Sequence, residues 1–323
     1  MELVAEGRET LIQPPDLNEF RRWNRTQKPK ALIDKRMGEY DAIHKFVYDG
    51  AYIGTELYGT VRAPMSLCRE IIRQGFKDLR VAGQGVYELD MMAAAGQLKE
   101  IDWTYIGLEV YGLSASLRRA VESGQVTKVV EWSNAAISWR FKAAAMGVPF
   151  LPTRVMLGTD TFNYSSAKAV KCPFTGHTLC LLPALILDVG LIHVSRCDKY
   201  GNSQVDGISG FAAEMARASK RLIISTEEIV DEEVIREKPE NTIIPYYLVD
   251  AVVEAPFGSH PGEMTYKYER DEAHIKSYYQ DSRDPEKVKT YLEKWVYNLK
   301  DHQEYLEQVG DATLSELAFG EEK

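Results

Sequence analysis

Short apolar runs alternate with segments of helical periodicity along most of the chain, from residue 41 onward. This alternation predicts βαβ units and an α/β fold with an open, largely parallel sheet flanked by helices. The predicted strands are residues 51–54, 79–82, 103–108, 129–132, 186–194 and 221–225. The last two of these strands are apolar enough to be buried on both faces, as in the middle of such a sheet.

Three of the predicted helices end at a glycine, which adopts the left-handed conformation of a helix C-terminus without strain. These helices are residues 64–74, 114–123 and 135–146, followed by Gly75, Gly124 and Gly147. A further amphipathic helix is expected over residues 286–306. Its inward side would carry Val288, Leu292, Trp295 and Leu299.

The first 40 residues differ from the rest of the chain. Pro14 and Pro15 interrupt any regular element, and basic residues gather around Trp23. One interpretation is an arm that binds nucleic acid, but few aromatic residues accompany the basic ones. We therefore expect a solvated extension, residues 1–40, that lies on a neighbouring subunit. One α/β domain, residues 41–323, would follow it.

Composition excludes several classes of protein. The 323 residues include 39 Lys+Arg and 48 Asp+Glu, a net charge of -9, which disfavours nucleic acid and anionic membranes as partners. Four cysteines are too few for a secreted disulfide framework. Apolar stretches fall short of the roughly 20 residues of a membrane helix, and the first 20 residues lack a signal core. A cytoplasmic enzyme is expected.

Two motifs of catalytic or metal-binding type are incomplete. Residues 112–116 lack the second glycine of a serine-hydrolase elbow, so Ser114 is better explained as a helix N-cap. Cys172, His177 and Cys180 are residue types that bind zinc, but the usual paired C-x2-C spacing is absent. A hairpin loop with incidental thiols is the favoured interpretation, and no metal site is predicted.

Glycines mark the ends of two predicted strands. Gly83 and Gly85 follow one strand, but Glu88 stands where a dinucleotide-binding loop has its third glycine. Gly54 and Thr55 end the preceding strand. Ligands of parallel sheets bind at this edge, where glycines let backbone N–H groups approach them closely. These four positions are therefore candidates for ligand binding.

Three polar residues near the same edge are ambiguous. Asn134 lies between a strand and a helix N-terminus, so its amide can face a developing negative charge or simply cap the helix. Glu109 follows the strand that ends at Leu108 and could do acid–base work, although a solvated carboxylate is favoured there. His260 lies in a turn-rich loop, where a structural or exposed role is more common than a catalytic one.

Four stretches together resemble the A subunit of the glutaconate CoA-transferase type, within the family I CoA-transferases. They are residues 71–75 with 79–85, 143–152, 249–261, and 293–296 with 301–305. The likeness runs from about residue 45 to about 310. It implies the CoA-transferase (NagB/RpiA-like) fold, with residues 41–323 as the α-subunit domain and a homologous B subunit completing a hetero-oligomer.

The resemblance also implies a mechanism. A glutamate of the B subunit would attack an acyl-CoA, pass through a glutamyl-CoA thioester and deliver CoA to a small carboxylic acid. Coenzyme A thioester is then a substrate, and no tightly bound cofactor is expected. Related succinyl-CoA:3-oxoacid transferases carry a glutamine, which looks like an oxyanion donor, where Asn134 falls in this chain.

Two alternatives stay open. The chain also resembles ring-opening hydrolases of steroid-degradation CoA thioesters, which align a glutamate with Asn134. An amide at this position favours transfer over hydrolysis, although Glu109 could supply a base from another strand and would line the same pocket. The chain could also be a non-catalytic subunit that only completes the fold of its partner.

Overall fold

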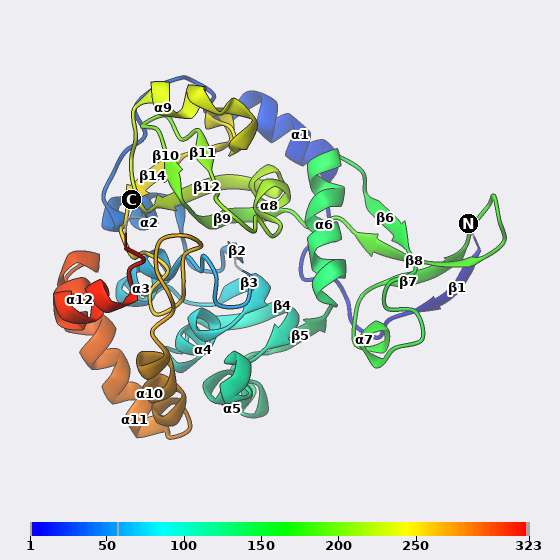
Figure 1. Ribbon diagram of the computed structural model, residues 1–323. Coiled ribbons are helices and arrows are strands. Elements are labelled where there is room, and N and C mark those ends of the chain that lie inside the picture. The colour runs from blue at the N-terminus through cyan, green and yellow to red at the C-terminus, as the bar shows by residue number, and fades with distance from the viewer. Residues whose placement is uncertain (1, 57, 321–323) are drawn as a thin grey trace.

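A seven-stranded parallel sheet forms the centre of the computed structural model, which describes residues 2–56 and 58–320 (Figure 1). Its strand order is β14-β12-β9-β2-β3-β4-β5. The predicted open parallel α/β sheet is confirmed. The strands are β2 Tyr52–Glu56, β3 Leu79–Gly85, β4 Leu98–Ile106, β5 Lys128–Glu131, β9 Leu187–Val194, β12 Ser219–Thr226 and β14 Ala251–Glu254.

Helices cover both faces of this sheet. Because side chains alternate along a strand, Ile53 of β2 joins one apolar cluster and its neighbour Tyr52 joins the other. The first cluster is closed by α2 Glu39–Phe46, α3 Met65–Gln74, α4 Tyr87–Ala94 and α5 Ala115–Glu122. The second is closed by α1 Leu17–Thr26, α6 Asn134–Met146 and α8 Ala212–Ala218. As predicted, α3 and α6 end at Gly75 and Gly147 in the left-handed conformation.

Two small antiparallel sheets lie beside the central one. The first has the order β1-β7-β8-β6 and lies beyond α6 (Figure 1). Its strands are β1 Leu3–Glu6, β6 Phe150–Thr153, β7 Lys168–Lys171 and β8 Thr178–Pro183, and α7 Asp160–Asn163 precedes β7. The second sheet comprises β10 Arg196–Cys197, β11 Ser203–Gln204 and β13 Thr242–Ile244, with α9 Glu232–Glu237 before β13. Cys172 and His177 close the hairpin between β7 and β8, which confirms the predicted hairpin loop.

The N-terminal segment lies on its own chain. β1 pairs with β7, and the ammonium group of Lys28 lies 2.5 Å from a buried oxygen of Asp250. Burial lowers the pKa of Lys28 to about 8. Lys35 donates to the carbonyl of Tyr246. The expectation of a solvated extension is therefore corrected at both lysines, whose buried positions require these partners. The boundary at residue 40 falls within α2 and stays a prediction.

The prediction of a single helix over residues 286–306 is wrong. The chain forms α11 Pro285–Leu292, a π-helical turn over Glu293–Tyr297 and α12 His302–Val309. The break occurs because Asp301 is an N-cap and accepts a hydrogen bond from Glu304 N. The apolar periodicity continues across the turn, since Val288, Leu292 and Val296 all enter the first cluster. α10 Glu272–Ser282 precedes this region and α13 Asp311–Leu317 follows it. In the described residues, no helix combines the length and hydrophobicity of a membrane span.

Candidate active site

A cavity of about 650 Å³ opens at the carboxyl edge of the central sheet. Three neighbouring strands contribute to it: Gln84 lies near the end of β3, Tyr105 lies near the end of β4, and Asn134 follows β5. We call this space the edge cavity. The polar residues on its wall are Thr60, Gln84, Glu109, Asn134, Glu263 and Arg270. Asn134 and Glu109, which the sequence predicts at the same edge of the sheet, thus lie on the wall of one cavity.

Asn134 is the first residue of α6, and its side chain is exposed at the edge cavity. The N-cap is the preceding residue, Ser133, whose hydroxyl accepts a hydrogen bond from Ala136 N at 3.1 Å. The alternative interpretation of Asn134 as the N-cap is therefore wrong. Since Ser133 caps the helix, the Asn134 amide stays available at a helix N-terminus, where negative charge is stabilised.

Glu109 begins a short 3-10 turn, Glu109–Tyr111, directly after β4. Its side chain is half-buried, and its φ of 50° lies in the left-handed region that few residues other than glycine adopt. A Cβ added to Gly59 would lie 3.4 Å from a carboxylate oxygen of Glu109. Glu109 therefore combines a place on the cavity wall with backbone strain, which is common at functional sites.

The glycines at the strand ends have packing reasons for their small size. A Cβ at Gly54 would lie 2.3 Å from the Leu187 side chain, and one at Gly83 would lie 2.7 Å from the carbonyl oxygen of Thr55. One at Gly85 would meet the side chain of Trp103 at 2.5 Å. Thr55 itself is fully buried. The role of these four residues in admitting CoA stays a prediction.

The sequence did not predict four polar residues of the cavity wall, nor the buried carboxylate of Glu88. Glu263 accepts a hydrogen bond from Thr60 Oγ1 at 2.5 Å, and Arg270 contacts the carboxylate of Glu272. Glu263 and Arg270 reach the cavity from the long segment after β14, whose course no local pattern predicts. Thr60 and Gln84 were not singled out, and Glu88 was noted only for its place relative to a glycine motif. A carboxylate within an apolar segment was the available signal for Glu88.

Three buried residues could offer ligands to a metal. One ligand atom each from His260, Asp271 and His274 lies within 4.8 Å of the others. Each group already has a protein partner: His260 contacts Tyr305 at 2.7 Å and Asp271 at 3.3 Å, and His274 contacts Tyr291 at 2.7 Å. These five residues are named the histidine cluster.

The charge beside the histidine cluster disfavours a bound dication. The guanidinium of Arg69 lies 3.6 Å from the ring centroid of Tyr305 and donates to the carbonyl oxygen of His260. Asp271 is the one carboxylate among the three potential ligands, and the Arg69 guanidinium adds a positive charge beside them. Burial lowers the pKa of His260, so its imidazole is neutral near pH 7. We interpret the cluster as structural, in keeping with the expectation for His260.

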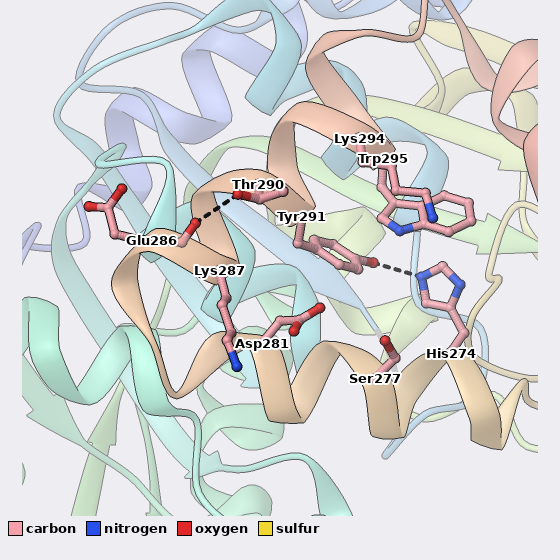
Figure 2. Close-up of a pocket in the computed structure, with 9 residues that line it drawn as sticks. All are labelled: His274, Ser277, Asp281, Glu286, Lys287, Thr290, Tyr291, Lys294 and Trp295. Atoms are coloured by element: carbon pink, nitrogen blue, oxygen red, sulfur yellow. Dashed lines mark hydrogen bonds between the residues drawn. The ribbon is translucent and has the colours of Figure 1, made fainter.

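A second cavity, of about 500 Å³, lies between α10 and α11. Figure 2 shows the Tyr291 hydroxyl directed at the His274 ring, with Trp295 and Lys294 beside it. None of the residues that sequence analysis proposed for chemistry is on its wall among the described residues. The edge cavity is therefore the site on which the sequence and the geometry agree.

The family model for coenzyme A transferases matches residues 39–255. This chain belongs to that family. The A subunit of glutaconate CoA-transferase from Acidaminococcus fermentans is 32% identical over 304 residues, which are 88% of this chain and 95% of the relative. The A subunit of a 3-oxoadipate CoA-transferase from Pseudomonas knackmussii is 32% identical over 84% of this chain and 96% of the relative.

Two further comparisons define the range of the family. The crystal structure of the Acidaminococcus fermentans glutaconate CoA-transferase superposes with a TM-score of 0.85 at 31% identity, over 89% of this chain and 96% of the other. One subunit of a cholesterol ring-cleaving hydrolase from Rhodococcus jostii is 30% identical over 80% of this chain and 92% of the relative. The predicted CoA-transferase fold, and the resemblance to the glutaconate CoA-transferase type, are confirmed.

Proposed function

We propose that this chain is the A subunit of a CoA-transferase and moves CoA between an acyl-CoA and a small carboxylic acid. The observation that carries the proposal is the edge cavity, whose wall contains the available amide of Asn134 and the carboxylate of Glu109 after the carboxyl ends of two adjacent parallel strands. The relatives named as A subunits of glutaconate and 3-oxoadipate CoA-transferases support the reaction and the need for a B subunit.

The covalent steps use a glutamate of the B subunit. Its carboxylate oxygen attacks the thioester carbon, and the C–S bond breaks. The CoA thiolate departs, and a glutamyl–acyl anhydride remains on the enzyme. The thiolate then attacks the glutamyl carbonyl, the anhydride C–O bond breaks, and the original acyl group leaves as a carboxylate. The same steps in reverse, with the acceptor acid, regenerate the glutamate. No water, proton or electron is consumed.

This chain contributes stabilisation of charge. Each attack places a negative charge on a former carbonyl oxygen, and a donor fixed at that point lowers the barrier. Asn134 supplies such a donor from the N-terminus of α6, where the helix dipole adds to the effect. Glu109 lines the same wall.

The rim of the edge cavity supports the shared site. Val110 is 81% exposed, and Tyr58 and Tyr105 are also exposed on the cavity wall. Exposed apolar side chains gathered around a cavity are typical of a surface that a partner protein covers. We assign this surface to the B subunit, whose glutamate would enter the cavity from that side.

Trapping of the covalent intermediate tests the proposal. The complex reconstituted with its B subunit is incubated with glutaryl-CoA, a saturated relative of glutaconyl-CoA, and then with hydroxylamine or borohydride. By mass spectrometry, we expect a modified glutamate in the B subunit. We also expect CoA to pass to acetate, and turnover to require this acceptor acid. Turnover without any acceptor, and without an adduct, would contradict transfer.

A matched variant separates transfer from ring-opening hydrolysis. An amide at position 134 cannot accept a proton, so a hydrolase built on this site would depend on Glu109 as the base. We expect Glu109→Gln to retain most of the transferase activity. Loss of all activity in this variant would favour the hydrolase.

A further inference from the structure

The side chain of Gln84 is on the wall of the edge cavity and is only 8% exposed. Within the described part of the chain, no protein group forms a hydrogen bond with its amide. Gln97 differs in position: its Nε2 donates to the Ile71 carbonyl, its Oε1 is buried without a partner among the described residues, and it is not on the wall of the edge cavity. Gln84 is therefore placed to bind something that enters the cavity.

The chain turns from β3 into α4 two residues after Gln84. Val86, with φ of -120° and ψ of -109°, is the N-cap residue of α4, and its apolar side chain forms no capping hydrogen bond. The conformation of this turn therefore depends on contacts from other residues.

Glu88 provides one of those contacts. Its carboxylate accepts a hydrogen bond from Val86 N at 3.0 Å and contacts Thr55 Oγ1 at 3.5 Å. The side chain is fully buried, and burial raises the pKa of this carboxyl to about 7. No cation pairs with it among the described residues. By accepting from Val86 N, this buried carboxylate holds the turn in the conformation that puts Gln84 on the cavity wall.

We propose that Gln84 is a second oxyanion donor of the transferase reaction and that Glu88 is the positioning residue that holds it. This inference rests on the proposed function. The Gln84 amide donates to the negatively charged oxygen formed when the glutamate or the thiolate attacks, while the Asn134 amide donates to the same oxygen from α6. Two donors on the ends of two strands, β3 and β5, would then define the point where charge develops.

Kinetics of the Gln84→Ala variant test the catalytic part. In the reconstituted complex, with glutaryl-CoA and acetate, we expect kcat to fall about 10²–10³-fold with KM nearly unchanged, since the contact forms only as charge develops. Gln97→Ala is the matched control, because it removes a buried amide that does not reach the cavity. It should lower the melting temperature and leave kcat unchanged.

The outcomes separate the two proposals. An active wild-type complex with an unchanged kcat for Gln84→Ala overturns the second donor. A raised KM with normal kcat overturns it too, because Gln84 would then bind the substrate and the transition state equally. Failure of the wild-type complex to form the glutamyl adduct overturns the transferase itself, and the role of Gln84 with it.

A double-mutant cycle tests Glu88. Glu88→Ala should lower kcat at least about 10-fold in the wild-type background and have little further effect in the Gln84→Ala background, since both changes remove one contact. Glu88→Gln keeps an oxygen for Val86 N and should restore kcat to within about 3-fold. Additive losses in the two backgrounds, or failure of Glu88→Gln to restore kcat, would reduce Glu88 to a purely structural role.

Discussion

The edge cavity and the histidine cluster contain similar polar groups in different surroundings. In the histidine cluster, His260 and His274 form hydrogen bonds with Tyr305 and Tyr291 at 2.7 Å, deep in the protein. In the edge cavity, no hydrogen bond to the side-chain amides of Gln84 and Asn134 is formed by any described residue. Polar groups that form hydrogen bonds with one another, as in the histidine cluster, stabilise the fold. Polar groups without protein partners beside a cavity, as in the edge cavity, can bind a ligand.

The largest effect that this comparison predicts is the loss of the Asn134 amide. Asn134→Ala should reduce kcat of the reconstituted complex about 10²–10³-fold, because one oxyanion donor is removed. The melting temperature should not change, since the side chain is exposed. Steady-state kinetics with calorimetry measures both quantities.

Lys142→Ala is the control for this change, because Lys142 is exposed on the same helix and lies away from the cavity wall. Lys142→Ala should change neither kcat nor the melting temperature. Full activity of Asn134→Ala would contradict the oxyanion role and remove the distinction between the two regions.

A change in the histidine cluster should have the opposite outcome. His260→Ala leaves the buried hydroxyl of Tyr305 without a partner and removes one of the two contacts of the Asp271 carboxylate, so we expect a loss of about 3 kcal/mol in the free energy of unfolding. The kcat of the folded fraction should be unchanged. Tyr305→Phe removes one hydroxyl and should cost about 1–2 kcal/mol in urea denaturation. A 10-fold fall in kcat without unfolding would place the cluster in the active site.

Sequence patterns predicted the sheet well, for a physical reason. Buried parallel strands are short apolar runs, and a glycine with positive φ ends a helix visibly, as Gly75 and Gly147 do. Asn134 could also be recognised from the sequence, since a strand end followed by a helix start is a local signal. Gln84 could not be recognised from the sequence, because its importance depends on the cavity and on the turn at Val86, which only the folded chain shows.

Residues that reach the site from distant segments were equally hidden. Arg270 and Glu263 follow β14, the edge strand of the sheet, yet they line a cavity at β3 and β4. The break in the expected helix over residues 286–306 had a signal in Asp301, which is a common N-cap residue. The continuous apolar periodicity concealed it.

The glycines at the strand ends give a smaller effect that tests packing against ligand approach. Gly54→Ala introduces a Cβ at 2.3 Å from Leu187 and 3.0 Å from Met215, so we expect a loss of about 1–3 kcal/mol in stability and an unchanged KM for acyl-CoA. Gly38→Ala is the control, since the nearest atom there lies 4.0 Å away. A raised KM without loss of stability would favour the role in CoA binding.

The two regions should also differ in how pH changes their stability. The ring of His302 stacks against Tyr305 of the histidine cluster. Burial, with Arg69 nearby, lowers the pKa of His302 to about 3, and burial lowers that of His274 to about 3. Between pH 6.5 and 3 the unfolded chain therefore binds protons that the folded chain does not. Each histidine destabilises the fold by roughly 1.4 kcal/mol per unit as pH falls through this range.

Glu88, behind the edge cavity, has the opposite sign. Burial raises the pKa of this carboxyl from 4.5 to about 7, so between these values the folded chain binds a proton that the unfolded chain does not. The fold is thereby stabilised by roughly 1.4 kcal/mol per unit as pH falls from 7 to 4.5. Glu88→Gln removes this contribution and leaves the histidines. Compared with the wild type, the variant should become less stable by that amount for each unit of acidification, in urea denaturation between pH 4.5 and 7. The other titrating groups are common to both proteins and cancel in the difference. A difference independent of pH would mean that Glu88 is ionised throughout this range, and that its hydrogen bonds with Val86 and Thr55 outweigh the cost of burying its charge.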